Sequence, residues 1–149
     1  MHQAVDECGG DEPRTRPVRA AVAYDTSLGS GLISDSRDFV RSFLLHLQSA
    51  CDATVSRQAT ATAQIVVSEL VTNALKYARG SCLVQLEARA DSLEVAVWDS
   101  SPVLPVVRQP DPGRVGQHGL EIVKALCRSV ESQSASAGKW VRAVVALTD

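Results

Sequence analysis

The stretch Val67-Ser68-Glu69-Leu70-Val71-Thr72-Asn73-Ala74 decides the fold of this chain, because it sets the buried face of a long predicted helix. Apolar residues recur around it at intervals of three and four, the period of an amphipathic helix. The helix is predicted to run from about Ala53 to Ala78 and to stop at Gly80, since glycine suits a helix C-terminus. Its buried stripe comprises Ala63, Val66, Val67, Leu70, Val71, Ala74, Leu75 and Ala78.

Two polar residues of this stretch lie at the edge of the buried face. At about 100° per residue, Glu69 and Asn73 are about 40° apart and one turn from each other. Lys76 falls near the same line, so a carboxylate, an amide and an ammonium project together at the rim of the core. Hard oxygen ligands suit Mg²⁺, which takes one or two protein oxygens and fills its shell with phosphates and water. A solvated helix edge is the alternative interpretation.

The rest of the chain alternates between strand and helix patterns. The predicted elements are a strand over 18–24, a helix from about 34, the long helix, strands over 84–88 and 93–97, a helix from about 119, and strands over 129–134 and 139–147. The strand patterns alternate apolar with polar residues, which indicates one buried and one wet face. This order favours an α+β fold, a two-layer sandwich with a mostly antiparallel sheet and helices on one face.

Length and composition indicate one domain of an ordinary globular protein. Residues 1–17 are polar and aperiodic and are predicted to be a disordered leader, so the domain covers 18–149. No apolar run approaches the roughly 18 residues that cross a bilayer, and no secretory segment follows Met1. The four cysteines are far apart and are predicted to be reduced thiols of a cytoplasmic protein.

Charge argues against nucleic acid and membrane partners. Fifteen basic and seventeen acidic residues give a net charge of −2, without a basic block. A protein that binds duplex DNA or RNA normally carries a basic stripe. We therefore expect no direct contact with nucleic acid.

A second candidate group is Asp99, at the end of the strand over 93–97. It shares the parity of Leu93, Val95 and Val97, so the alternation directs its side chain into the helix–sheet interface. A buried carboxylate is costly without a hydrogen-bond donor. The exocyclic amine of adenine would be a suitable donor, and a carboxylate that caps a strand end is the alternative.

A third cluster opens the helix near residue 119. Residues 100–115 contain four prolines, and a loop of this length inside a domain is typical of a lid or binding loop. Gly116 and Gly119 follow, where glycines allow close backbone approach and helix N–H groups attract phosphate. His118 between them is either a phosphate contact or a solvated loop histidine. Near the last turn, Lys139 is interpreted as a turn lysine, whereas Trp98 and Trp140 are interpreted as packing residues.

Together the three clusters resemble the GHKL ATPases, the histidine-kinase-like ATP-binding fold also called the Bergerat fold. The stretch 67–74 is similar to the N-box of that family, 99–102 to its first glycine box, and 116–123 to its second. The resemblance covers residue 18 to the C-terminus. Two positions depart from the pattern: Ser101 replaces a glycine, and Trp140 replaces a threonine after Gly138-Lys139.

The resemblance implies ATP and Mg²⁺ as cofactors, with an ATP lid over the site. It assigns Asn73 to the metal, Glu69 to catalysis as general base or as the residue that orients the attacking hydroxyl, and Asp99 to the adenine amine. The phosphates fall to Gly116, Gly119, Lys76 and His118.

The chain looks most like the stand-alone anti-sigma factor serine kinases of the RsbW and SpoIIAB type, found among actinobacterial single-domain regulators. That similarity implies a serine/threonine-protein kinase that acts in transcription regulation. Its expected partners are a sigma factor, an anti-anti-sigma factor of the STAS type, and a second copy in a homodimer. The alternative is a nucleotide-sensing module that does not transfer phosphate.

Overall fold

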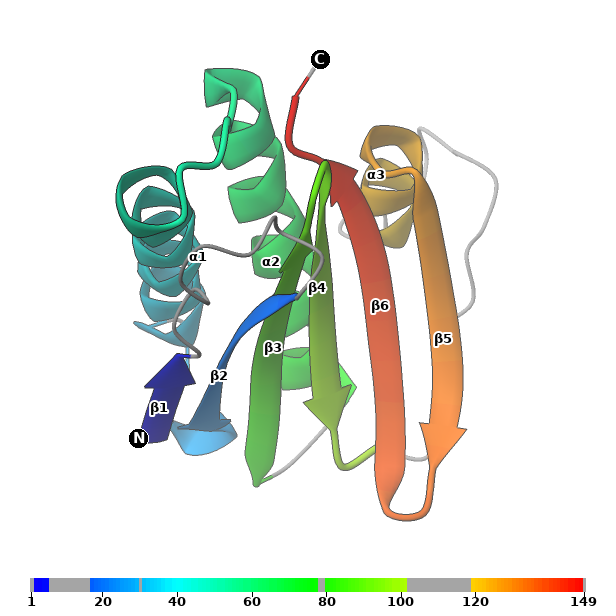
Figure 1. Ribbon diagram of the computed structural model, residues 1–149. Helices are drawn as coiled ribbons and strands as arrows, with labels where there is room; N and C mark the ends of the chain where they lie inside the picture. The colour runs from blue at the N-terminus through cyan, green and yellow to red at the C-terminus, as the bar shows by residue number, and fades with distance from the viewer. Residues whose placement is uncertain (1, 6–16, 30, 78–79, 102–118, 149) are drawn as a thin grey trace.

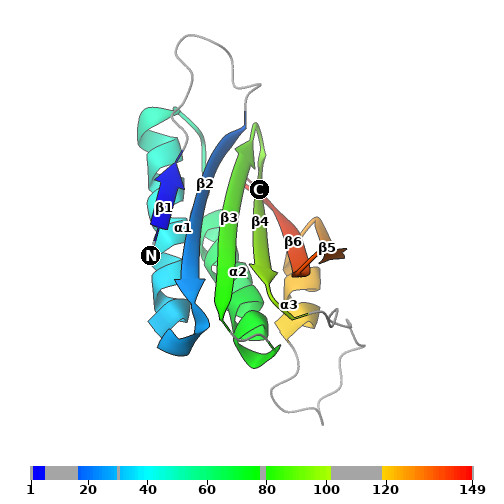
Figure 2. The ribbon, with the colours of Figure 1, turned by 90° about the horizontal axis from the view of Figure 1, so that it is seen from below.

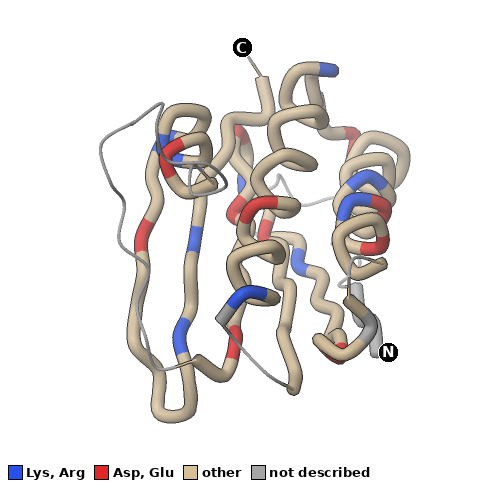
Figure 3. The backbone as a smooth tube through the Cα atoms, turned by 180° about the vertical axis from the view of Figure 1, so that it is seen from behind, with Lys and Arg blue, Asp and Glu red and all other residues tan. Residues whose placement is uncertain are grey.

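The computed structural model describes residues 2–5, 17–29, 31–77, 80–101 and 119–148. Its elements are β1 (His2–Val5), β2 (Val18–Asp25), the 3₁₀ turn η1 (Thr26–Leu28), α1 (Gly31–Ala50), α2 (Arg57–Tyr77), β3 (Ser81–Arg89), β4 (Ser92–Asp99), α3 (Gly119–Leu126), β5 (Ser129–Ala135) and β6 (Gly138–Ala146). The strands form a six-stranded sheet in the order β1-β2-β3-β4-β6-β5, and every neighbouring pair is antiparallel. The three helices lie together on one face of that sheet (Figures 1 and 3). The predicted α+β two-layer fold is therefore confirmed.

The core lies between the sheet and its helices. In β3 and β4 the predicted apolar residues Val84, Leu86, Leu93, Val95 and Val97 are buried, and the alternation is interrupted only at Ala96 of β4, which is buried as well. In α2 the whole predicted stripe from Ala63 to Ala74 is buried. Helix α2 packs on α1, α3, β4 and β6 and is therefore the central element of the helix layer (Figure 2).

Both long helices begin at residues other than those expected. Helix α2 starts at Arg57 and not at Ala53, because Ser56 caps it: the Ala59 N–H donates to the Ser56 hydroxyl oxygen at 3.0 Å. The loop before it is tied down by a hydrogen bond of 2.9 Å from the Ser56 N–H to the Leu147 carbonyl. Helix α1 already begins at Gly31, before the start that the sequence predicts near residue 34.

The N-terminal segment and the cysteines differ from what the sequence predicts. Strand β1 lies inside the segment expected to be a disordered leader, and its four residues pair with β2 from His2↔Ala23 to Val5↔Ala20. Residues 6–16 lie outside the described part. Cys51 is disulfide-bonded, whereas Cys82 and Cys127 are free thiols. In the described chain, no helix is both long and apolar enough to cross a membrane.

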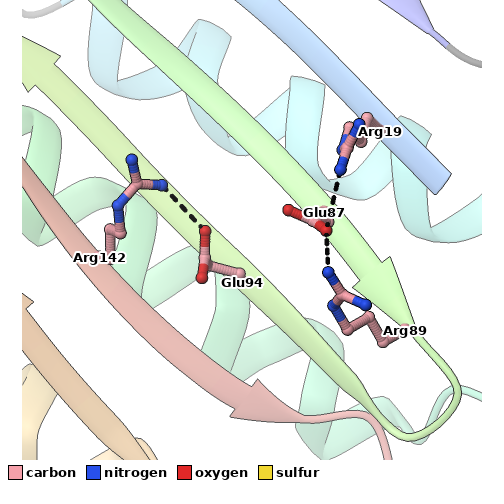
Figure 4. Close-up of polar contacts among 5 residues, drawn as sticks. All are labelled: Arg19, Glu87, Arg89, Glu94 and Arg142. Atoms are coloured by element: carbon pink, nitrogen blue, oxygen red, sulfur yellow. Dashed lines mark hydrogen bonds and ion pairs between the residues drawn. The ribbon is translucent and has the colours of Figure 1, made fainter. Parts of the chain in front are cut away.

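The sheet face away from the helices carries charged side-chain pairs, both between neighbouring strands and within β3 (Figure 4). Glu87 accepts ion pairs from Arg19 at 3.5 Å and from Arg89 at 2.8 Å, and Arg142 pairs with Glu94 at 3.1 Å. Such surface pairs contribute about 0–1 kcal/mol each to the free energy of unfolding, so their main effect is to keep this face polar. Basic and acidic residues are interspersed along the described backbone (Figure 3).

Gly138 lies at a close approach between two strands. Its φ of +131° is a conformation that side chains rarely adopt, and a Cβ built there would collide with the Asp99 carbonyl oxygen. Glycine is therefore required at the start of β6, and its absence of a side chain lets β6 lie directly against the end of β4.

We expect Gly138→Ala to lower the free energy of unfolding by about 2 kcal/mol or more, because the collision is with backbone that cannot move aside. Urea denaturation followed by circular dichroism measures the effect. Gly31→Ala is the matched control, since a Cβ there meets nothing within 4 Å. We expect the control to stay within about 1 kcal/mol of the parent chain. Equal stability of the two variants would contradict the proposed close approach.

Candidate functional site

The polar pair on α2 lies where the sequence predicts it, at the rim of the helix–sheet core. Glu69 and Asn73 are both half-buried, one turn apart, between the buried residues Leu70 and Ala74. Among the residues that the structure describes, neither side chain makes a hydrogen bond or an ion pair. Their oxygens are therefore available to a ligand.

The neighbouring hydroxyl groups are used differently. Ser68 donates to the Gln64 carbonyl at 2.7 Å, and Thr72 donates to the Ser68 carbonyl at 2.6 Å. Hydroxyl groups that bond back to the preceding turn are satisfied by the helix itself. Ser68 and Thr72 are therefore occupied by hydrogen bonds within α2, whereas Glu69 and Asn73 remain as the candidate ligand groups of this stretch.

Glu69 lies against the first residue of α3. A Cβ built at Gly119 would be 2.6 Å from Glu69 Oε2, closer than atoms that are not bonded approach each other. The first turn of α3 therefore packs directly on the Glu69 carboxylate. This contact joins the first and the third sequence clusters, which are 50 positions apart.

The other predicted phosphate contacts are less defined. Lys76 lies in the last turn of α2 and is exposed. Gly116, His118 and all of the predicted lid over 100–115 except its first two residues lie outside the described residues, so the assignments to them stay predictions.

Asp99 ends β4 with its side chain inside the fold, as its parity predicts. It is 2% exposed, and its Oδ1 accepts a hydrogen bond of 2.8 Å from the Ser101 N–H. Its Oδ2 lies 3.3 Å from the Nζ atom of Lys139 on β6. Lys139 is 0% exposed and directly opposite Asp99 in the strand register. The two side chains therefore form a buried ion pair.

The interpretation of Lys139 as a turn lysine was wrong. Lys139 is the second residue of β6 and has the inward parity of Val141, Ala143 and Val145, all of which are buried. That parity was visible in the sequence, but the neighbouring Gly138 suggested a longer turn. Trp140 has the opposite parity. The Arg142 guanidinium lies over its ring, with the Cζ atom 4.7 Å from the centroid of the Trp140 ring.

The serine that replaces the family's glycine causes no backbone strain. Ser101 is buried, and among the described non-glycine residues only Asp52 has a positive φ. The position therefore does not need glycine for its conformation. Its N–H instead holds the Asp99 carboxylate in place.

Cys82 on β3 reports on the charge of this site. It pairs with Asp99 in the strand register, and burial, with a smaller contribution from the Asp99 charge, raises the pKa of its thiol to about 11. Burial alone raises the pKa of the Cys127 thiol to about 11. The two thiols differ in that only Cys82 is close to the carboxylate.

The C-terminal end of α2, the end of β4 and the start of β6 lie at the same end of the sheet (Figure 1). The described part of the chain holds no group of three or more His, Cys, Asp and Glu residues that could form a metal site. A carboxylate and an amide oxygen on α2 suit Mg²⁺ that is shared with phosphates, because such a metal takes only one or two protein ligands. The residues present therefore fit a magnesium-bound nucleotide.

Comparison with known proteins gives a family match over most of the chain. Residues 33–145 match the family described as "Histidine kinase-like ATPase domain". Among solved structures, the chain is similar to the histidine kinase domain from Erythrobacter litoralis EL346 blue-light activated histidine kinase, at 27% sequence identity and a TM-score of 0.44. That similarity covers 60% of this chain and 45% of the other, so it spans less than half of the histidine kinase domain. No curated protein matches the chain.

A double-mutant cycle tests the contact between Glu69 and Gly119. We expect Gly119→Ala to be less favourable in the parent chain than in Glu69→Ala, by about 0.5 kcal/mol or more, because the new methyl must displace the carboxylate. In the Glu69→Ala background the methyl gains helix propensity without a collision. Chemical denaturation of the four chains gives the coupling. A coupling of zero would contradict the packing of α3 on Glu69.

The charge on Asp99 can be read from Cys82. We expect Asp99→Asn to lower the pKa of the Cys82 thiol, although burial, the larger cause, should keep it above 9. More thiolate at pH 9 means faster alkylation by iodoacetamide, which mass spectrometry resolves for each cysteine. Cys127 is the internal control for general opening of the fold. An equal acceleration at Cys82 and Cys127, or none at Cys82, would contradict the proposed charge.

Proposed function

Because the chain belongs to the histidine kinase-like ATPase domain family, we propose that it binds ATP together with Mg²⁺ in the site formed by α2, the first turn of α3 and the end of β4. The contact of Gly119 with the Glu69 carboxylate is the observation that supports this proposal best. It brings the start of a helix, where N–H groups attract phosphate, to the two free oxygen ligands of α2.

Each residue receives a role from its position. Asn73 supplies an amide oxygen to Mg²⁺, and Lys76 adds a positive charge near the phosphates from the exposed end of α2. Gly116, His118 and Gly119 are the residues proposed to contact the phosphates. Asp99 accepts a hydrogen bond from the exocyclic amine of adenine. Asn73 would hold the Mg²⁺, which when bound would supply positive charge beside the phosphates.

Glu69 is the catalytic residue of the proposal. Its half-buried carboxylate makes no other polar contact among the described residues, so it can accept the proton of a hydroxyl that attacks the terminal phosphate. Phosphoryl transfer depends on such positioning more than on covalent chemistry of the protein. The proposed acceptor is a serine of a partner protein.

We further propose that the chain is an anti-sigma factor or serine kinase of a partner-switching pathway in the cytoplasm. It would sequester a sigma factor, phosphorylate an anti-anti-sigma factor of the STAS type, or do both, as a homodimer. The support is the resemblance of the three motifs, together with a site in which Glu69 and Asn73 are both present and accessible to a ligand.

Two variants separate binding from transfer. We expect Asn73→Ala to weaken magnesium-dependent ATP binding about tenfold or more, because the metal loses its protein ligand, as measured by isothermal titration calorimetry. We expect Glu69→Gln to bind ATP but to lose phosphate transfer to a STAS partner by about 10²-fold or more, since a base is removed. Labelled ATP and a purified candidate partner measure the transfer.

Glu87→Gln is the matched control, because that carboxylate lies on the open face of the sheet and pairs there with Arg19 and Arg89. It should change neither quantity. Transfer that survives Asn73→Ala unchanged would contradict the assigned site. Binding of ATP without any transfer by the parent chain would favour a nucleotide-sensing module, and absence of binding would contradict both functions.

A further inference from the structure

The sheet ends in two unequal edge strands, β1 and β5 (Figure 1). Strand β1 has four residues, whereas β5 has seven, of which all but Val130 and Ala135 are exposed. Among the described residues, β5 pairs with β6 alone. Its other side therefore presents a row of backbone N–H and C=O groups without a strand partner in the described part of the chain.

The sequence of β5 lacks the features that keep an edge strand from pairing with another chain. Such edges usually carry proline, lysine, a bulge or a charge that points inward. Strand β5 contains neither proline nor lysine, and its register with β6 is unbroken from Ser129↔Val144 to Ala135↔Gly138. Its residues on the helix side, Val130, Ser132 and Ser134, are uncharged, and Glu131 is the one charged residue of the strand. Another strand can therefore add to this edge.

The strand is complementary to a second copy of itself. Two copies related by a twofold axis perpendicular to the sheet pair antiparallel and keep both helix layers on the same face. All of 129–135 is paired when that axis passes through Ser132. Ser132 then lies opposite Ser132 of the second copy, and Glu131 lies opposite Gln133.

Other registers that keep the faces aligned are less favourable. Because cross-strand partners point to the same face, the register can shift only so that the axis moves to the next residue on either side. An axis through Glu131 leaves only 129–133 paired and places two carboxylates opposite each other, which is destabilising. An axis through Gln133 leaves only 131–135 paired. Charge and backbone pairing therefore both favour the axis through Ser132.

We propose that β5 is the surface through which the chain forms a homodimer, by antiparallel pairing with β5 of a second copy about an axis through Ser132. This inference rests on the homodimer named in the proposed function and assigns it an interface. Strands α2 and β4 belong to neither side of that pairing, so Glu69, Asn73 and Asp99 stay outside the interface. Dimerisation and nucleotide binding can therefore be measured separately.

Opposite charges at position 133 test the interface, because they have opposite expected effects. In the proposed register, Gln133→Lys places an ammonium opposite Glu131 of the second copy, and symmetry repeats the pair. Gln133→Glu places two carboxylates there. We expect the dissociation constant of the dimer to fall about threefold or more in Gln133→Lys and to rise about threefold or more in Gln133→Glu. Analytical ultracentrifugation of the intact chain at low ionic strength measures both constants.

Ser42→Lys and Ser42→Glu are the matched controls. They change the net charge by the same amounts at an exposed residue of α1, away from the sheet edge. We expect both to keep the dissociation constant within about twofold of the parent value.

Cysteine cross-linking tests the register. Ser132→Cys places two thiols opposite each other, with Cα atoms about 5 Å apart, which a disulfide can span. Ser134→Cys places its two thiols four residues apart along the strands, about 13 Å, which is too far. Under mild oxidation by air with a copper catalyst, we expect a covalent dimer from Ser132→Cys and none from Ser134→Cys or the parent chain. Electrophoresis without reductant and peptide mass mapping identify the linked residue.

The outcomes separate this inference from the nucleotide site. A parent chain that stays monomeric up to its solubility limit overturns the inference and leaves the edge to a strand of another protein. A dimer with the same dissociation constant in both Gln133 variants, or with no cross-link at Ser132→Cys, also overturns it and moves the interface to another surface. Calorimetric titration with Mg-ATP tests the proposed nucleotide binding independently, since neither result depends on the other.

Discussion

The helices cover only one face of the sheet, and the rest of the structure follows from this constraint. Each strand must place its apolar residues on the covered face, so polar residues there need partners inside the fold. Asp99 and Lys139 are the only charged residues among the buried side chains of the described chain. They form an ion pair at the end of the sheet, near the half-buried side chains of Glu69 and Asn73 on α2. The exceptions to the apolar layer therefore gather at one end of the molecule.

Most of the fold could be predicted from local patterns, because the spacing of apolar residues within one helix or strand shows which of its faces is buried. The stripe of α2, the β3–β4 hairpin and the inward direction of Asp99 follow from them. The contact of Glu69 with Gly119 could not, since it joins residues 50 positions apart and depends on how α3 docks. The start of α2 was missed because a serine cap at Ser56 outweighs the apolar pattern before it. Strand β1 was missed because its pairing with β2, and not its composition, makes it a strand.

The site divides into two parts with different physical requirements. The part on α2 and α3 consists of half-buried oxygens and a glycine contact, which suits a metal and phosphates that keep some water. The part on β4 and β6 is buried: Gly138 packs on the Asp99 backbone carbonyl, and the Ser101 N–H donates to the Asp99 carboxylate. A base needs fixed donors and acceptors more than it needs solvent, so this part suits the adenine end. A half-buried part for the metal and phosphates and a buried part for the base thus lie at the same end of the sheet.

Hydrogen–deuterium exchange with and without Mg-ATP tests this account most directly, because it reports on both parts of the site at once. The account predicts slower amide exchange in peptides that cover residues 69–76, 96–101 and 119–123 when the nucleotide is present. Peptides of α1 and of the open edge strand β5 should not change. Protection confined to elements other than α2, β4 and α3, or no protection at nucleotide concentrations that saturate related domains, would contradict a nucleotide site at this end of the sheet.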